Sequence, residues 1–121
     1  MEGETSTGLR ENIAGLLCYL VGWVTGLVFL LLEQDNRFVR FHALQSIIVF
    51  GTVTVISIVL SILTALFMAI SPLGIINAVL GIISTLIWLF ALALWIVLMV
   101  KAYQGETFEL PWAGDIAKRH L

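Results

Sequence analysis

The sequence predicts an all-α integral membrane protein: a bundle of three transmembrane helices in a single domain covering residues 1–121. Composition and charge placement carry this prediction. Of the 121 residues, 60% are hydrophobic and 12% are charged, which lies outside the usual composition of soluble domains. Residues 41–100 contain no Asp, Glu, Lys or Arg. A small soluble domain leaves too much surface in water to hide so many apolar side chains, so we expect the bilayer to be the solvent.

The lengths of the apolar runs predict where the helices lie. A helix rises about 1.5 Å per residue and the hydrocarbon core is about 30 Å thick, so one span takes about 20 residues. The charge-free run is long enough for two spans, and "SPLG" at 71–74 marks the break, because Pro lacks a backbone donor and Gly is conformationally free. A fourth span would leave hairpins without polar turn residues. We expect transmembrane helices over 12–32, 38–70 and 73–103, an acidic N-terminal tail (1–11) and a C-terminal strap (104–121).

The distribution of basic residues predicts the orientation of these helices. Short loops rich in Lys and Arg tend to stay in the cytoplasm. Three spans would leave Arg10 on one side of the membrane and every other Lys and Arg on the opposite side. We therefore expect the N-terminus outside and the C-terminus in the cytoplasm.

Small residues at four-residue spacing predict how the helices pack. Gly22 and Gly26 follow this spacing in the first helix, with Gly15 upstream, and Ser57 and Ser61 follow it in the second. Such positions allow close approach of helices in lipid, where packing replaces the hydrophobic drive. We expect contacts within the chain, with a homodimer seam as the alternative. In the third helix, Asn77 could form an interhelical hydrogen bond.

The segment "FVRFHALQS" at the start of the second helix has two polar faces. At about 100° per residue, His42, Gln45 and Ser46 fall in one sector, and Arg37 and Arg40 fall on the other side. The arginines can reach lipid phosphate and fix the depth and topology of the helix. Polar groups turned toward hydrocarbon cost free energy unless they find partners or water. The other stripe is therefore either a hydrogen-bonded clamp to the first helix or the C-terminal segment, or the lining of a passage or docking cleft.

The C-terminal strap combines acidic, aromatic and basic residues just beyond the third helix. Its Pro and Gly residues make one uninterrupted helix unfavourable. Aromatic and apolar side chains would anchor it in the interface on the same side as the polar stripe. The strap residues that we single out are Pro111, Trp112, Gly114 and Asp115.

Several functional classes are excluded by what the sequence contains. A net charge of −2 gives no basic footprint for nucleic acid. A single Cys with two His residues makes a zinc site improbable, and we expect no metal and no cofactor. HExxH, GxSxG, a phosphate-binding Gly loop and paired intramembrane carboxylates are all missing, so we identify no catalytic residue and expect no enzymatic activity.

Three segments resemble a known family. These are "GLLCYLVG" in the first helix, "RFVRFHALQSI", whose residues 40–43 and 45–46 carry the strongest likeness, and "AYQGETFELPWAGDIA". Together they resemble the small prokaryotic membrane proteins grouped with the Tic-type component of the chloroplast inner-envelope protein-import machinery. The resemblance implies a polytopic protein of a prokaryotic cell membrane that supports a translocon.

We therefore expect a non-enzymatic membrane module that assembles in the bilayer or handles polypeptides. The alternative is an oligomeric small channel or transporter subunit with the polar stripe in its pore. The expected partners are the lipid bilayer and either a second copy or another membrane protein.

Overall fold

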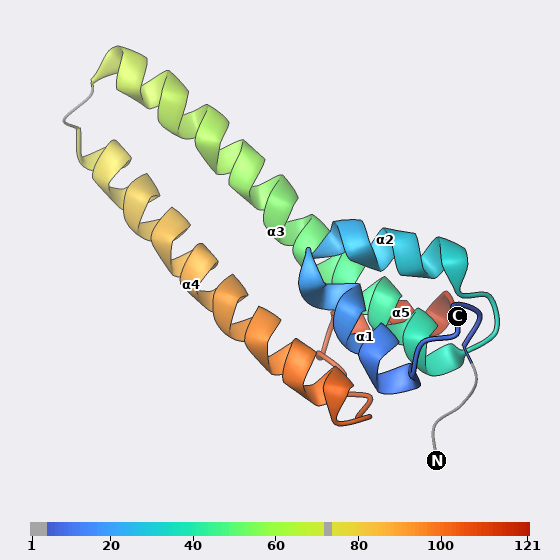
Figure 1. The fold of residues 1–121 in the computed structure, drawn as a ribbon. Coiled ribbons are helices and arrows are strands. Elements are labelled where there is room, and N and C mark those ends of the chain that lie inside the picture. The colour runs from blue at the N-terminus through green and yellow to red at the C-terminus, as the bar shows by residue number, and fades with distance from the viewer. Residues whose placement is uncertain (1–4, 72–73) are drawn as a thin grey trace.

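The computed structural model describes residues 5–71 and 74–121, and this part of the chain is all-α. Two long helices run antiparallel as a hairpin, and three short helices gather round one end of it (Figure 1). We call residues 5–50 together with 98–121 the cap, and residues 51–97 the outer hairpin. The helices are α1 (Glu11–Leu20), α2 (Trp23–Leu32), α3 (Arg37–Ile70), α4 (Ile75–Tyr103) and α5 (Ala113–Arg119).

The long helices α3 and α4 lie where the sequence places its second and third helices, within two residues at each end. They are the two helices in the described part of the chain that are long and apolar enough to cross a membrane. The turn between them falls at the expected "SPLG" break, although Pro72 and Leu73 themselves lie outside the described residues.

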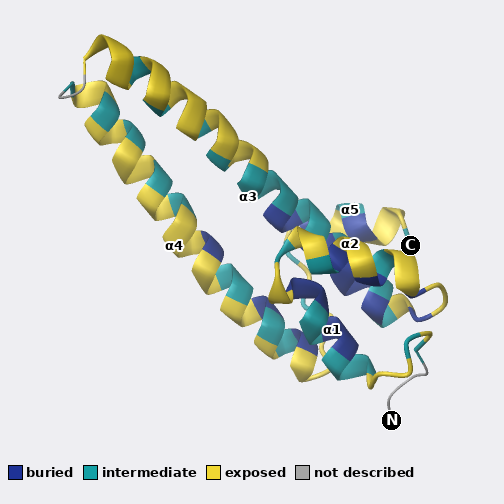
Figure 2. Cartoon of the chain, turned by 45° about the horizontal axis from the view of Figure 1, so that its top comes forward, coloured by how far each residue is buried: buried dark blue, intermediate teal, exposed yellow. Residues whose placement is uncertain are grey.

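The outer hairpin is held together along one seam. Half-buried residues recur every three or four positions on both helices, which is the spacing of a coiled-coil contact. They are Ser57, Leu60, Thr64 and Phe67 in α3, and Leu80, Ser84 and Ile87 in α4. The remaining sides of both helices are apolar and exposed, as the yellow ribbon in Figure 2 shows. Two helices in contact along a single stripe leave most of their apolar surface for the bilayer to cover.

The predicted first span is wrong as a continuous helix. Residues 11–32 form two helices of 10 residues each, separated at Val21 and Gly22. Gly22 has φ of 61°, a left-handed conformation that favours glycine and ends the helix there. A helix of this length rises about 15 Å, which is half of what a bilayer core requires.

The expected orientation is not supported either. Because α1 and α2 turn back instead of crossing, the first described residues and α5 lie at the same end of the hairpin (Figure 1). An N-terminus and a C-terminus on opposite sides of a membrane would need an odd number of spans. With α3 and α4 as the candidate spans, both flanking segments fall on one side.

The core of the protein lies in the cap. One buried cluster joins Tyr19 of α1 to Phe50 of α3 and Leu98 of α4, with Ala113 of α5 beside them. A second cluster packs α1, α2 and the first turns of α3 round Cys18. The buried residues of α3 all fall between Val39 and Phe50. The cap is thus a small helical core built on the base of the hairpin.

Candidate functional site

The first turns of α3 pass through the centre of the cap and carry its buried polar side chains. The helix starts behind Asn36, whose side chain accepts a hydrogen bond from the backbone N–H of Val39. His42, Gln45 and Ser46 are all fully buried. The helical spacing that places them on one face therefore turns that face toward protein rather than lipid or water.

The His42 ring bridges α1 and the strap. Its Nδ1 lies 2.7 Å from the Tyr19 hydroxyl, and its Nε2 lies 3.0 Å from the backbone oxygen of Glu106. A carbonyl oxygen only accepts, so Nε2 carries the proton, and Nδ1 accepts from the Tyr19 hydroxyl. Both ring nitrogens are satisfied by the neutral imidazole in one tautomer.

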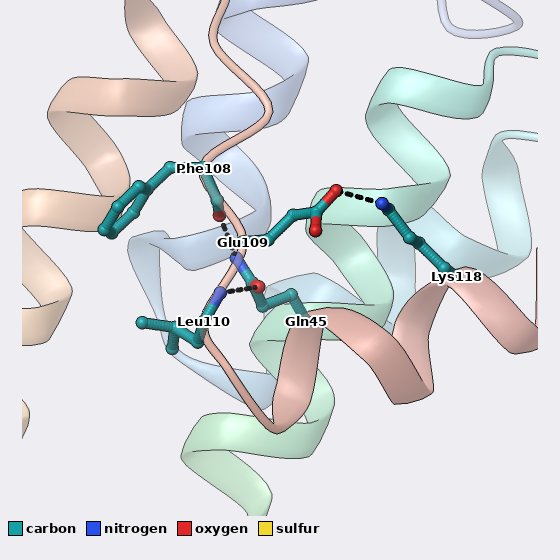
Figure 3. Close-up of polar contacts among 5 residues, drawn as sticks. All are labelled: Gln45, Phe108, Glu109, Leu110 and Lys118. Atoms are coloured by element: carbon teal, nitrogen blue, oxygen red, sulfur yellow. Dashed lines mark hydrogen bonds and ion pairs between the residues drawn. The ribbon is translucent and has the colours of Figure 1, made fainter.

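The side chain of Gln45 binds backbone groups of the strap. Its Nε2 donates to the Phe108 oxygen at 2.9 Å, and its Oε1 accepts from the Leu110 N–H at 3.0 Å (Figure 3). The same Nε2 donates to the Tyr19 hydroxyl at 3.0 Å. The side-chain amide thus pairs with alternate residues of an extended segment, as a neighbouring strand would. We call Tyr19, His42, Gln45 and their strap partners the strap network.

An ion pair and a glycine complete the docking of the C-terminal segment. The Glu109 carboxylate in the strap pairs with Lys118 of α5 (Figure 3). A Cβ on Gly114 would stand 2.8 Å from the Glu109 Cβ and 3.3 Å from the Gln45 Oε1. Gly114 therefore lets α5 approach the strap network closely.

The other strap residues singled out from the sequence lie at the surface. Pro111 and Trp112 line an apolar pocket of about 390 Å³ against α3 and α4. Trp112 is 55% exposed, and Asp115 is exposed in the first turn of α5.

Ser46 serves a different part of the cap. Its hydroxyl donates to the Gly22 oxygen at 2.8 Å, at the break between α1 and α2. Gly26 lies beside it, where an added Cβ would be 2.9 Å from the Ala43 backbone oxygen. At Gly15 an added Cβ would be 2.8 Å from the Phe38 ring. These two glycines bring α1 and α2 into close contact with α3.

The two arginines expected at lipid phosphate have different surroundings. Arg37 is exposed and lines an open pocket of about 320 Å³ with Phe38 and Lys118. Arg40 instead turns back to the loop before α3, where its Nη1 donates to the Glu33 backbone oxygen at 2.8 Å. Headgroup binding therefore remains a prediction for Arg37, whereas Arg40 closes the connection between α2 and α3.

The outer hairpin holds the remaining candidates. Asn77 donates to the Ser71 oxygen at 2.7 Å, and so ties the start of α4 to the residue that caps α3. The Ser57 hydroxyl is buried without a hydrogen-bond partner in the described structure, and Ser61 is exposed.

A fully buried carboxylate, Glu33, was missed by the sequence reasoning. It accepts hydrogen bonds from the backbone and hydroxyl of Ser6 at 2.8 and 2.7 Å, and from the N–H groups of Asp35 and Asn36. Burial raises the pKa of this carboxyl, but the hydrogen bonds together hold the pKa below its ordinary value. Glu33 joins the N-terminal segment to the loop before α3. The position of this carboxylate directly after an apolar run was the feature of the sequence that could have indicated it.

The hydrogen bonds of the strap network hold the strap against α1 and α3. Each polar atom of His42 and Gln45 is bonded within the chain, and both side chains are closed to solvent. Cys18 is buried as well and contacts the Val39 oxygen at 3.6 Å. Within the described residues, no group of three or more His, Cys, Asp or Glu side chains is placed to hold a metal ion.

Comparison with known proteins identifies the family. The family model described as the magnetosome magnetite crystal formation protein family matches residues 7–117. A UPF0132 membrane protein of Methanocaldococcus jannaschii is 48% identical over 98% of this chain and 94% of its own length. Another from the same organism is 45% identical over 93% of this chain and 71% of its own length. One from Archaeoglobus fulgidus is 38% identical over 93% of this chain and 97% of its own length.

These matches correct the resemblance stated above. They show no link to the Tic-type translocon component, so that identification was wrong, and a protein-import role is not supported. No solved structure matches the chain at a significant level. The chain is a membrane protein that belongs to the magnetosome magnetite crystal formation protein family.

Proposed function

We propose that this protein is a non-enzymatic membrane component that works by helix–helix assembly. In this proposal the outer hairpin associates within the bilayer with further copies or with another membrane protein, and the cap stays at one membrane surface. The observation that carries the proposal is the apolar, exposed outer side of α3 and α4. No residue of the most apolar 18-residue stretch of α3 is buried in the chain's own fold.

Small residues on this outer side support assembly over a purely lipid-facing role. A Cβ added to Gly81 would meet nothing within 4 Å, and Thr85, exposed, lies one turn further along α4. In lipid, helices associate by close packing at such small residues. The seam with α3 does not use Gly81, so the position is free to receive another helix.

A channel is not favoured by the geometry. The polar stripe that motivated this alternative is occupied by Tyr19, the strap and the break between α1 and α2.

The family description concerns magnetite crystal formation. Our proposal uses the membrane hairpin and does not depend on metal binding.

The proposal is tested by mass and crosslinking measurements at Gly81. Gly81→Leu fills the open position without touching the chain's own core, and Val79→Leu is the matched control on the same helix. We expect the wild type and Val79→Leu to form oligomers or a crosslinked complex in native membranes and nanodiscs. We expect Gly81→Leu to lose this association. A wild-type monomer with no crosslinked protein partner in native membranes would contradict the proposal.

A further inference from the structure

At the break between α1 and α2, backbone groups form hydrogen bonds with side chains from other helices. Where a helix ends, its last carbonyl groups lose their partners. Here the Trp95 indole of α4 donates to the Tyr19 oxygen at 2.7 Å, and the Ser46 hydroxyl of α3 donates to the Gly22 oxygen. Side chains from both long helices thus add hydrogen bonds to carbonyl groups of the break, one in the last turn of α1 and one at the residue that caps α2.

Thr25 of α2 also forms hydrogen bonds with backbone groups at this break. Its hydroxyl accepts from the Val21 N–H at 3.1 Å and lies 3.3 Å from the Cys18 oxygen. A turn in water needs none of these side chains, because solvent supplies the hydrogen bonds. In hydrocarbon, irregular backbone is tolerated where neighbouring helices and Ser or Thr side chains satisfy it.

The surface of α2 gives a second, independent observation. Its outer side is apolar and exposed (Figure 2), and residues 13–32 contain no charged side chain. In water an exposed apolar surface of this extent would be a liability. The exposed side chains include Val24 at 44%, Val28 at 45%, Leu31 at 71% and Leu32 at 54%.

We propose that α1 and α2 form a re-entrant helical hairpin that enters the bilayer from the cap side, turns at Gly22 and returns without crossing. Each helix of 10 residues rises about 15 Å, which is too short to cross a core of about 30 Å, so the chain returns to the side from which it entered. The charged residues Glu11 and Glu33 lie at the two outer ends of the helix pair, which we place at the membrane surface. This surface of the cap therefore has the lipid hydrocarbon as its partner.

The basic residues place that surface in the cytoplasm. All six Lys and Arg residues lie in the cap, and the described residues of the hairpin turn carry none. By the tendency of basic flanks to remain inside, both flanking segments of the protein are cytoplasmic and the turn near Ser71 is external. This topology takes the spanning hairpin of the proposed function as given.

Labelling of introduced cysteines tests this topology. Leu9→Cys, Gln34→Cys and Ser71→Cys are treated with a membrane-impermeant maleimide in inverted and right-side-out vesicles. The wild type, with its buried Cys18, sets the background, and Cys18→Ala replaces it if that background is high. We expect positions 9 and 34 to react only in inverted vesicles, and position 71 only in right-side-out vesicles.

Val28→Cys and Leu31→Cys test whether α2 lies in hydrocarbon. In proteoliposomes we expect them to react at least about tenfold more slowly than Gln34→Cys, because the reactive thiolate is disfavoured there. A spin label at position 28 should be more accessible to oxygen than to a water-soluble nickel chelate.

Three outcomes would overturn a defined part of this account. Labelling of positions 9 and 34 from opposite sides would show that the segment crosses the membrane, and reaction of Val28→Cys at the rate of Gln34→Cys would place α2 in water. Either result defeats the re-entrant hairpin and leaves the assembly proposal standing. Labelling of position 71 from the same side as position 34 would show that α3 and α4 do not span, and would defeat the proposed function as well.

Discussion

Replacing Gln45 with Ala is expected to release the strap from α3. The substitution removes three hydrogen bonds: those to the Tyr19 hydroxyl, the Phe108 oxygen and the Leu110 N–H. Two of the abandoned partners are backbone groups of the strap. Each buried polar group left without a partner costs about 1–3 kcal/mol, so keeping the strap docked would cost roughly 2–6 kcal/mol.

The strap can avoid that cost by opening to water, so local exchange is the appropriate measurement. Hydrogen exchange at the Leu110 amide in nanodiscs reports the opening directly. We expect it to speed up by at least about tenfold, since each 1.4 kcal/mol corresponds to a factor of ten. Amides of α3 between residues 55 and 65 should change little.

The matched control is Gln34→Ala, which removes the same side chain from an exposed loop position. It should leave both exchange and thermal stability close to the wild type. Unchanged protection of the Leu110 amide in Gln45→Ala would refute the reasoning, because the strap would then be held without the network.

Two further predictions concern the rest of the cap. The pKa of Glu33 is held below its ordinary value of 4.5, so its stabilising effect should be present above about pH 4.5 and lost as the pH falls through the lower folded value. The gap in melting temperature between the wild type and Glu33→Gln should therefore narrow on acidification, and a constant gap would contradict the assignment. Gly26→Ala should destabilise the protein by about 1–3 kcal/mol in thermal unfolding, because the rigid Ala43 oxygen cannot move aside. Gly51→Ala, where a Cβ meets nothing within 4 Å, should instead stabilise α3 by about 0.5–1 kcal/mol; equal effects at both glycines would show that the packing is misread.

The long helices could be predicted from sequence because their signals are local. A charge-free run and one Pro-Gly break are enough to delimit α3 and α4 to within two residues. The break at Gly22 was not predictable in the same way. A glycine in an apolar helix has the same appearance whether it packs against a neighbour or turns the chain, and the groups that decide the matter here are Ser46 and Trp95, which are distant in sequence.

The candidate site was predictable in part for the same reason. Helical periodicity placed His42, Gln45 and Ser46 on one inward face, and the requirement for partners left a clamp or a wet cleft as the alternatives. The partners themselves lie 23 to 65 residues away, so no local rule could choose between them. The short segments that were compared with the Tic-type proteins pointed to the wrong family, whereas a match over nearly the whole chain identified the right one.

The strap network also dictates when the fold can be completed. Gln45 emerges from the ribosome 63 and 65 residues ahead of Phe108 and Leu110, which is roughly 3–13 s at ordinary rates of synthesis. During that interval its amide and the Nε2 of His42 have no strap to bind. The strap is therefore synthesised well after the helices whose interior it closes, and a nascent chain stalled at Tyr103 would leave these polar groups without their strap partners beside the membrane.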